Sequence, residues 1–124
     1  MSRSNDHSKD GLLTVTRSDE GSQVRVALDG ELDLSNTGIF ETNLTEAIDS
    51  GKKVVIDLGR LKFIDSTGLA LIVEMLGRND AERFSFLPSA SSDVRRLLKL
   101  TGLDERMVLS TTDVAASQPS LPAV

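Results

Sequence analysis

Near the start of the chain, apolar residues recur at every second position, which is the spacing of β-strands. Over residues 13–16 leucine and valine alternate with threonine, and over residues 23–28 valine and leucine alternate with glutamine, arginine and alanine. A strand turns successive side chains to opposite faces of a sheet, so each segment is expected to bury one face. The glycine-containing turn between them, Asp19 to Gly21, predicts that the two strands pair as an antiparallel hairpin.

Three later segments have the three- and four-residue spacing of amphipathic helices. Their apolar faces are formed, in chain order, by Phe40, Leu44, Ala47 and Ile48; by Leu69, Ile72, Val73 and Leu76; and by Val94, Leu97 and Leu98. Asp33 or Ser35 can cap the first helix, and Gly51 suits its end. The third helix is expected to begin near Asp93 and to close at Gly102.

Between the helices lie further strand signals. Residues 53–58 form a nearly continuous apolar run, as expected for a strand buried on both faces of a parallel sheet. Residues 82–87 predict a strand that Pro88 ends, and residues 106–110 predict a short last strand. Strands alternating with helices imply right-handed crossovers. The fold class is therefore α/β, a mixed five-strand sheet with an antiparallel opening hairpin and helices packed on it.

The length of 124 residues corresponds to one domain, which we place at residues 11–110. Residues 1–10 are polar and aperiodic and predict a disordered N-terminal tail. Residues 111–124, rich in alanine, serine and proline, predict a loose C-terminal tail. With four Phe and no Trp or Tyr, the core must be aliphatic.

Composition narrows the functional classes. A net charge of -5 argues against nucleic acid and against an anionic membrane surface, both of which attract clustered lysine and arginine. The absence of cysteine excludes a disulfide framework and a thiolate metal site. No apolar run approaches the roughly 20 residues needed to span a bilayer, and the polar N-terminus is not a secretory signal. A cytoplasmic protein that acts on other proteins is expected, with a monomer as the free state.

The residues give little support for a catalytic site. The one histidine, His7, lies in the predicted tail, and no G-x-S-x-G elbow surrounds Ser66, so a serine hydrolase is not indicated. Both phosphate-binding glycine motifs are absent, and no set of residues has metal-ligand spacing. Asp57 invites comparison with a receiver-domain phosphoacceptor, but the acidic pair and lysine of that chemistry are missing, so we interpret it as a strand-end hydrogen-bonding residue. We expect no enzyme activity, no cofactor and no metal.

The segment "LKFIDSTGLALIVEML" places Asp65, Ser66 and Thr67 where the second helix should begin. Each can cap a helix. Gly68 in the first turn costs about 1 kcal/mol relative to alanine, so the missing side chain must allow either tight packing on the sheet or close approach by another molecule. A phosphate on Ser66 would meet unpaired N–H groups of the helix, together with Asp65 and Asp33. It would make the surface repulsive to an acidic partner patch.

Three segments of the chain together resemble a known family. The segments are "DGELDLSN" at residues 29–36, "VVIDLGRLKFIDSTGLALIV" at residues 54–73 and "SDVRRLLKLTGL" at residues 92–103. In sequence and order they resemble STAS domains, specifically bacterial anti-sigma factor antagonists, over about residues 12–110. Many antagonists have G-L-G after the hydroxyl pair, where this chain has Ala70 as the third residue.

The resemblance implies a partner-switching regulator of transcription in stress responses. In that family, the unphosphorylated antagonist binds an anti-sigma factor that is also a serine kinase, which frees a sigma factor. Phosphorylation then releases the antagonist, and a PP2C-type serine phosphatase resets it. Carried over, Ser66 is the phosphoacceptor and Thr67 the less favoured hydroxyl. Asp33 and Asp65 would flank the phosphate, and Gly68 and Leu69 would lie at the docking surface.

Two other hypotheses stay open at the level of sequence. In one, the domain is a constitutive, non-phosphorylated STAS interaction subunit of a larger signalling or lipid-transport complex, and Ser66 only caps a helix. In the other, it is an enzyme that binds a small ligand or nucleotide on an α/β fold, although the chain has no cofactor motif. Phosphorylation at Ser66 would distinguish the partner-switching regulator from both of these alternatives.

Overall fold

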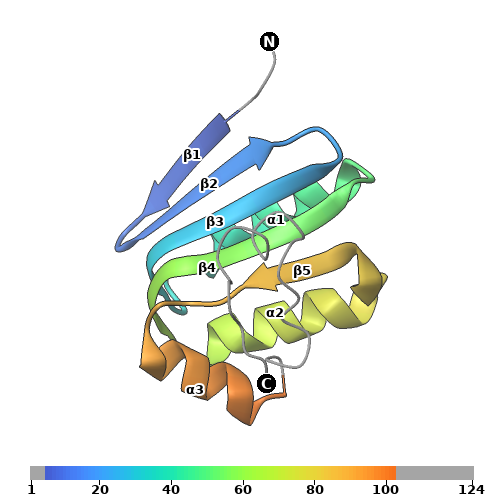
Figure 1. Ribbon diagram of the computed structural model, residues 1–124. Helices are drawn as coiled ribbons and strands as arrows, with labels where there is room; N and C mark the ends of the chain where they lie inside the picture. The colour runs from blue at the N-terminus through green and yellow to red at the C-terminus, as the bar shows by residue number, and fades with distance from the viewer. Residues whose placement is uncertain (1–4, 103–124) are drawn as a thin grey trace, which may run out of the picture.

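The computed structural model describes residues 5–102 as a five-strand sheet with three helices (Figure 1). In chain order the elements are β1 (Asn5–Asp10), β2 (Leu13–Asp19), β3 (Gln23–Leu32), α1 (Thr37–Asp49), β4 (Lys53–Ile64), α2 (Ser66–Arg78), a 3₁₀ turn (Ala81–Arg83), β5 (Phe84–Leu87) and α3 (Ser92–Leu100). The strands follow each other across the sheet in the order β1-β2-β3-β4-β5. The pairs β1–β2 and β2–β3 are antiparallel, and β3–β4 and β4–β5 are parallel. The predicted mixed five-strand sheet with its opening hairpin is therefore confirmed.

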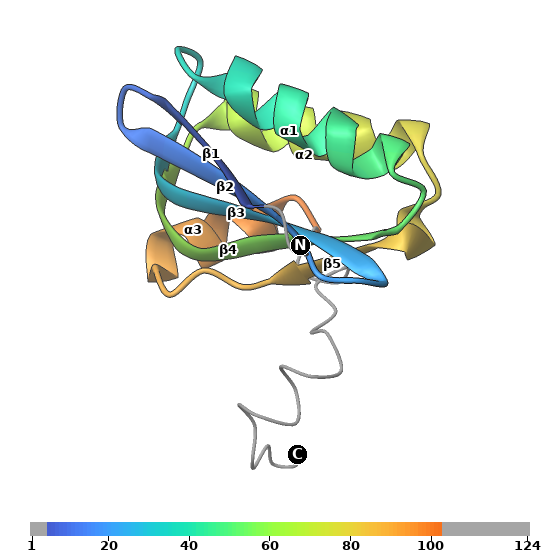
Figure 2. The ribbon, with the colours of Figure 1, turned by 90° about the horizontal axis from the view of Figure 1, so that it is seen from above.

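The helices cover both faces of the sheet. Figure 2 shows α1 and α2 together on one face and α3 on the other. This follows from two consecutive right-handed crossovers, β3–α1–β4 and β4–α2–β5, which place their helices on the same side. The predicted apolar faces meet in the core, where Phe40, Leu44, Ile72, Val94 and Leu98 are fully buried. Val73 is an exception: it was predicted on the apolar face of the second helix, but it is 48% exposed, so its place in the core was predicted wrongly. The core is aliphatic apart from its phenylalanines, as expected from the composition.

The N-terminal segment differs from the prediction. Residues 1–10 were expected to be a loose tail, but Asn5–Asp10 forms the edge strand β1 and pairs along its length with β2. Its residues are polar, so no apolar alternation marks it. Backbone hydrogen bonds to β2 hold it in the sheet, while the side chains of residues 7–10 are exposed or half-buried. Residues 1–4, the predicted strand at residues 106–110 and the predicted tail at residues 111–124 lie outside the described residues.

Strand β4 is twice as long as predicted, since it runs on from Leu58 to Ile64. The register against β3 shifts between Ala27 and Asp29 and again between Gly30 and Glu31, so the apolar alternation is broken while the pairing continues. Asp57 is consequently inside the strand and not at its end. Its carboxylate accepts from the N–H of Gly59 at 2.9 Å and pairs with Arg25 at 3.3 Å, a structural role beside the bulge.

Helix α1 begins later than predicted. The residue before its first turn is Asn36, whose side chain makes no capping hydrogen bond, so neither Asp33 nor Ser35 caps it. Instead, the carboxylate of Asp33 accepts from the N–H and the hydroxyl of Ser35 at 2.9 and 2.6 Å. This local turn uses the Asp33 carboxylate before the helix begins. The end of the helix agrees with the prediction, because Gly51 has a positive φ of 79°.

Candidate functional site

The segment singled out in the sequence lies where β4 passes into α2, beside the end of β3. The N–H of Asp65 donates to the carbonyl of Leu32 at 3.1 Å, which continues the β3–β4 pairing to the first residue before the helix. The carboxyl ends of two parallel strands therefore bring the β3–α1 turn and the start of α2 together. This is the edge of a parallel sheet at which binding loops commonly meet.

Asp65 is the capping residue of α2. Its Oδ1 accepts from the N–H groups of Thr67 and Gly68, both at 3.0 Å, and from the Thr67 hydroxyl at 2.5 Å. Its Oδ2 accepts from the N–H of Leu34 at 3.2 Å. One carboxylate thus joins the start of α2 to a turn that lies 31 residues earlier in the chain.

These contacts keep Asp65 ionised. Partial burial acts to raise the pKa of Asp65, but the hydrogen bonds from the Thr67 hydroxyl and from the N–H groups of Gly68, Leu34 and Thr67 outweigh it and lower the pKa below its ordinary value. The hydrogen bonds to Asp65 also change what was expected for a phosphate on Ser66. The N–H groups of Thr67 and Gly68 already have a partner in Asp65, so the prediction that a phosphate would find them unpaired is wrong.

The two neighbouring hydroxyls differ sharply. Ser66 is the first residue of α2 and is exposed to solvent. Its hydroxyl makes no hydrogen bond to any of the residues that the structure describes. Thr67 is half-buried, and its hydroxyl donates to Asp65. Only Ser66 therefore presents a hydroxyl that another protein can reach without breaking the helix cap.

Gly68 lies against the sheet. A Cβ built on it would approach Ile64 Cγ1 and Leu32 Cγ and Cδ2 to 2.9 Å each. Of the two explanations for this glycine, tight packing on the sheet is the one that the structure supports. Gly68 and Leu69 are both buried in the free protein, and their expected place at the docking surface stays a prediction. They support the surface from below.

The structure adds two residues that the sequence pattern did not single out. Asn36 is 1% exposed, and its side chain accepts from the N–H of Asp33 at 2.9 Å and donates to the carbonyl of Glu31 at 3.0 Å. It fixes the turn that carries Leu34, whose side chain is 72% exposed. Asp33 itself is half-buried at the same edge, with its carboxylate directed to Ser35. Leu34 could have been singled out in the sequence as a leucine among polar loop residues. Nothing in the sequence indicates that Asn36 is buried.

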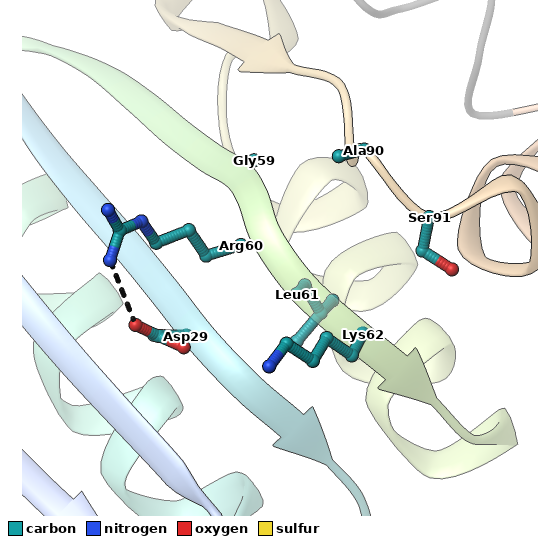
Figure 3. A pocket seen from close by; sticks show the side chains of 7 residues that line it. All are labelled: Asp29, Gly59, Arg60, Leu61, Lys62, Ala90 and Ser91. Atoms are coloured by element: carbon teal, nitrogen blue, oxygen red, sulfur yellow. Dashed lines mark ion pairs between the residues drawn. The ribbon is translucent and has the colours of Figure 1, made fainter.

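A hollow of about 550 Å³ lies elsewhere, on the face of the sheet that carries α3 (Figure 3). It is lined by Asp29, Gly59, Arg60, Leu61, Lys62, Ala90 and Ser91. Arg60 pairs with Asp29 across it at 3.6 Å. Because α2 packs on the opposite face, this hollow is separate from the surface around Ser66.

Comparison with known proteins agrees with this arrangement. The family model described as "Mlab, STAS domain" matches residues 15–110. The anti-sigma-F factor antagonist RsfB of Mycobacterium tuberculosis is 30% identical over 104 residues, which cover 81% of this chain and 83% of RsfB. The anti-sigma-B factor antagonist of Staphylococcus aureus is 31% identical over 99 residues, which cover 77% of this chain and 88% of that protein.

The fold is also shared with a solved structure, the crystal structure of an anti-sigma factor antagonist from Mycobacterium paratuberculosis. The TM-score is 0.72 at 24% sequence identity, over 85% of this chain and 92% of the other. Within residues 5–102, no helix is long and apolar enough to cross a membrane. The family match, the relatives and the shared fold agree, and the chain belongs to the STAS-domain family of anti-sigma factor antagonists.

Proposed function

We propose that this protein is an anti-sigma factor antagonist controlled by phosphorylation of Ser66. Unphosphorylated, it binds an anti-sigma factor that is also a serine kinase, and the sigma factor held by that kinase is freed. Phosphorylated, it dissociates, and a PP2C-type serine phosphatase restores it. Binding involves Ser66 and Thr67 together with Asp33 and Asp65, over buried Gly68 and Leu69. Because the cycle consumes ATP and acts on a sigma factor, we place it in the cytoplasm.

The observation that carries this proposal is the contrast between the two hydroxyls. Ser66 is exposed, whereas Thr67 is half-buried and donates to Asp65. Asp65 is the helix cap, so Ser66 is not needed for capping, which weakens the hypothesis that it is only a structural residue. The names of the relatives, which are antagonists of anti-sigma factors, support the same function.

The protein would contribute only the acceptor hydroxyl to the transfer. The Ser66 Oγ attacks the γ-phosphorus of ATP, the bond to the leaving ADP breaks, and the hydroxyl proton passes to a base of the kinase. The product carries about -1.5 to -2 charges at pH 7. These charges arise one residue from ionised Asp65, so an already acidic point becomes strongly anionic. A partner surface that accepts the neutral serine is then left with unpaired charge at the interface, which favours dissociation.

The test is incubation of the purified protein with ATP, Mg²⁺ and each anti-sigma factor kinase of the same organism, followed by intact mass and by mapping of the modified residue. We expect one added phosphoryl group, on Ser66, and none in Ser66→Ala. The matched control is Ser92→Ala, since Ser92 is exposed at the first position of α3 and should not be modified. A kinase that binds the protein tightly without modifying it would instead favour a constitutive interaction subunit.

A further inference from the structure

Large hydrophobic side chains are exposed at a few points on the described surface. They are Leu12, Leu34, Phe63, Val73 and Leu100. Two of them lie in segments that meet at Asp65, the residue before Ser66. Leu34 is joined to the residue before Ser66 by the hydrogen bond from its N–H to the Asp65 carboxylate, and Val73 lies on the helix that Ser66 begins. Exposed apolar side chains that gather at one place commonly mark a protein interface.

Leu34 is held in place although its side chain is in solvent. Its N–H is bound by Asp65 at 3.2 Å, and the turn around it is tied to buried Asn36 by the N–H of Asp33 at 2.9 Å. The N–H of Asn36 also donates to the carbonyl of Asp33 at 3.1 Å. A backbone so constrained loses little freedom when a partner covers the side chain that it carries, which favours the use of Leu34 as an anchor.

The exposed face of α2 continues the apolar surface. Ser66, Ala70 and Val73 are spaced i, i+4 and i+7, so they share one face, and all three are exposed. Val73 is about 10 Å along the helix from Ser66. No charged residue occurs in α2 before Glu74. An exposed helix face normally carries charged residues, so this uncharged stretch is unusual for a surface that stays in water.

We propose that Leu34, Ala70 and Val73 form an apolar docking patch around Ser66, and that the occupant is the anti-sigma factor kinase itself. The inference rests on the proposed function and deepens it. A kinase that reaches the Ser66 Oγ also covers its neighbours on the helix, of which Ala70 is about one turn away and Val73 about two. A stable complex buries about 800 Å² on each partner, far more than one serine supplies. The complementary kinase surface is apolar at its centre.

The patch also gives a reason for release. A phosphate on Ser66 would stand between the carboxylate of Asp65 and an apolar surface that the partner must desolvate, where a further unpaired charge is unfavourable. Leu34 and Val73 would then set affinity for the partner, while Ser66 sets whether binding is permitted. Affinity for the partner and control by phosphorylation can be tested separately, because neither Leu34 nor Val73 carries the phosphoryl acceptor.

The experiment measures the Kd of the full chain and of three variants for the kinase that phosphorylates Ser66. We expect Leu34→Ser and Val73→Gln to weaken binding about tenfold or more, from the lost apolar contact. At saturating kinase both should still be phosphorylated on Ser66, with KM raised and kcat unchanged. The matched control is Leu100→Ser, because Leu100 is 76% exposed at the end of α3, against 72% for Leu34. Its Kd should not change.

The thermal midpoints of all three variants should stay near that of the parent protein, because each side chain is largely or half exposed. If the parent binds and is phosphorylated on Ser66 while Leu34→Ser and Val73→Gln bind as tightly as Leu100→Ser, the docking patch is overturned and the phosphorylation cycle stands. If the parent is neither bound nor phosphorylated by any of the kinases, the proposed function fails with it.

Discussion

Helices α2 and α3 begin in closely similar ways. Each places an exposed serine, Ser66 or Ser92, at its first position, directly after a residue whose side chain caps the helix. The two capping side chains differ in the segments that they bind. The carboxylate of Asp65 accepts from its own helix and from Leu34 in another turn, whereas the hydroxyl of Ser91 accepts only from Val94, at 3.3 Å, among the contacts of residues 5–102.

The surfaces around the two serines differ more. The exposed face of α2 is uncharged as far as Glu74, and Leu34 lies beside its start. Charged residues surround the start of α3: Asp93, Arg95 and Arg96 on the helix, with Arg60 and Lys62 lining the hollow next to it (Figure 3). A negative charge added at Ser92 would have Arg95 and Arg96 on the same helix as well as Asp93, while one added at Ser66 would stand next to the carboxylate of Asp65 on a helix with no charged residue before Glu74. The position of a serine at a helix start is therefore not sufficient for a switch; its surroundings decide what a charge does.

The largest expected effect comes from placing a charge at each serine. Ser66→Asp should weaken binding of the anti-sigma factor kinase about a hundredfold, because the interface would have to desolvate an unpaired charge. Ser92→Asp should leave the Kd unchanged. Calorimetric titration of both variants against the same kinase measures the difference. Equal affinities for the two variants would show that the surroundings of Ser66 have no special role.

The second effect concerns the two caps. Asp65→Ala removes the acceptor of three N–H groups and one hydroxyl, and should lower the free energy of unfolding by about 2 kcal/mol. Ser91→Ala removes one longer hydrogen bond and should cost about 1 kcal/mol or less. Urea unfolding of both variants measures this. A smaller loss for Asp65→Ala than for Ser91→Ala would contradict the view that Asp65 links two parts of the site.

Much of the difference between the starts of α2 and α3 depends on residues that are close together in the sequence, so it could be predicted. The spacing of apolar residues predicted the three helices, and the Asp65-Ser66-Thr67 run predicted a capped start to α2. The link between Asp65 and Leu34 could not be predicted, because it joins residues 31 apart through the register of β3 against β4. Pairing with β3 continues past the register shifts, which extends β4 beyond the apolar run from which it was inferred.

The remaining differences from the prediction each have a physical cause that depends on contacts beyond the local pattern. Strand β1 is stabilised by backbone pairing at the sheet edge, which leaves no pattern in its side chains. Asn36, and not Asp33 or Ser35, precedes α1, because the Asp33 carboxylate is already used within its own turn. Gly68 was correctly flagged as unusual, but only its approach to Ile64 and Leu32 decided between packing and ligand access.

A third prediction tests the close packing of Gly68 on the sheet by comparing it with a second glycine of the same helix. Gly68→Ala places a Cβ 2.9 Å from side-chain atoms of Ile64 and Leu32, so it should destabilise the protein by about 1 to 2 kcal/mol despite the better helix propensity of alanine. Gly77→Ala meets nothing within 4 Å and should stabilise it by up to about 1 kcal/mol. Thermal and urea unfolding compare them. Equal shifts would mean that the start of α2 is not closely packed on the sheet.

The smallest effect expected is a difference in pH dependence between the two caps. The folded-state pKa of Asp65 lies below its ordinary value of 3.8, so the folded protein binds fewer protons than the unfolded chain in this range. The stabilisation from Asp65 is therefore complete above that value and is lost as the pH falls through it toward the folded-state pKa. Ser91 does not titrate, so its contribution should be independent of pH.

Urea unfolding between pH 7 and pH 3 measures both contributions. The gap in stability between the parent and Asp65→Asn should narrow at the acid end, because protonation gives the parent the same neutral acceptor that asparagine provides. The gap between the parent and Ser91→Ala should stay constant over the same range. If both gaps stayed constant, the hydrogen bonds to Asp65 would not favour its charged form. The ionised carboxylate beside Ser66, on which the proposed repulsion of the phosphate depends, would then lose its support.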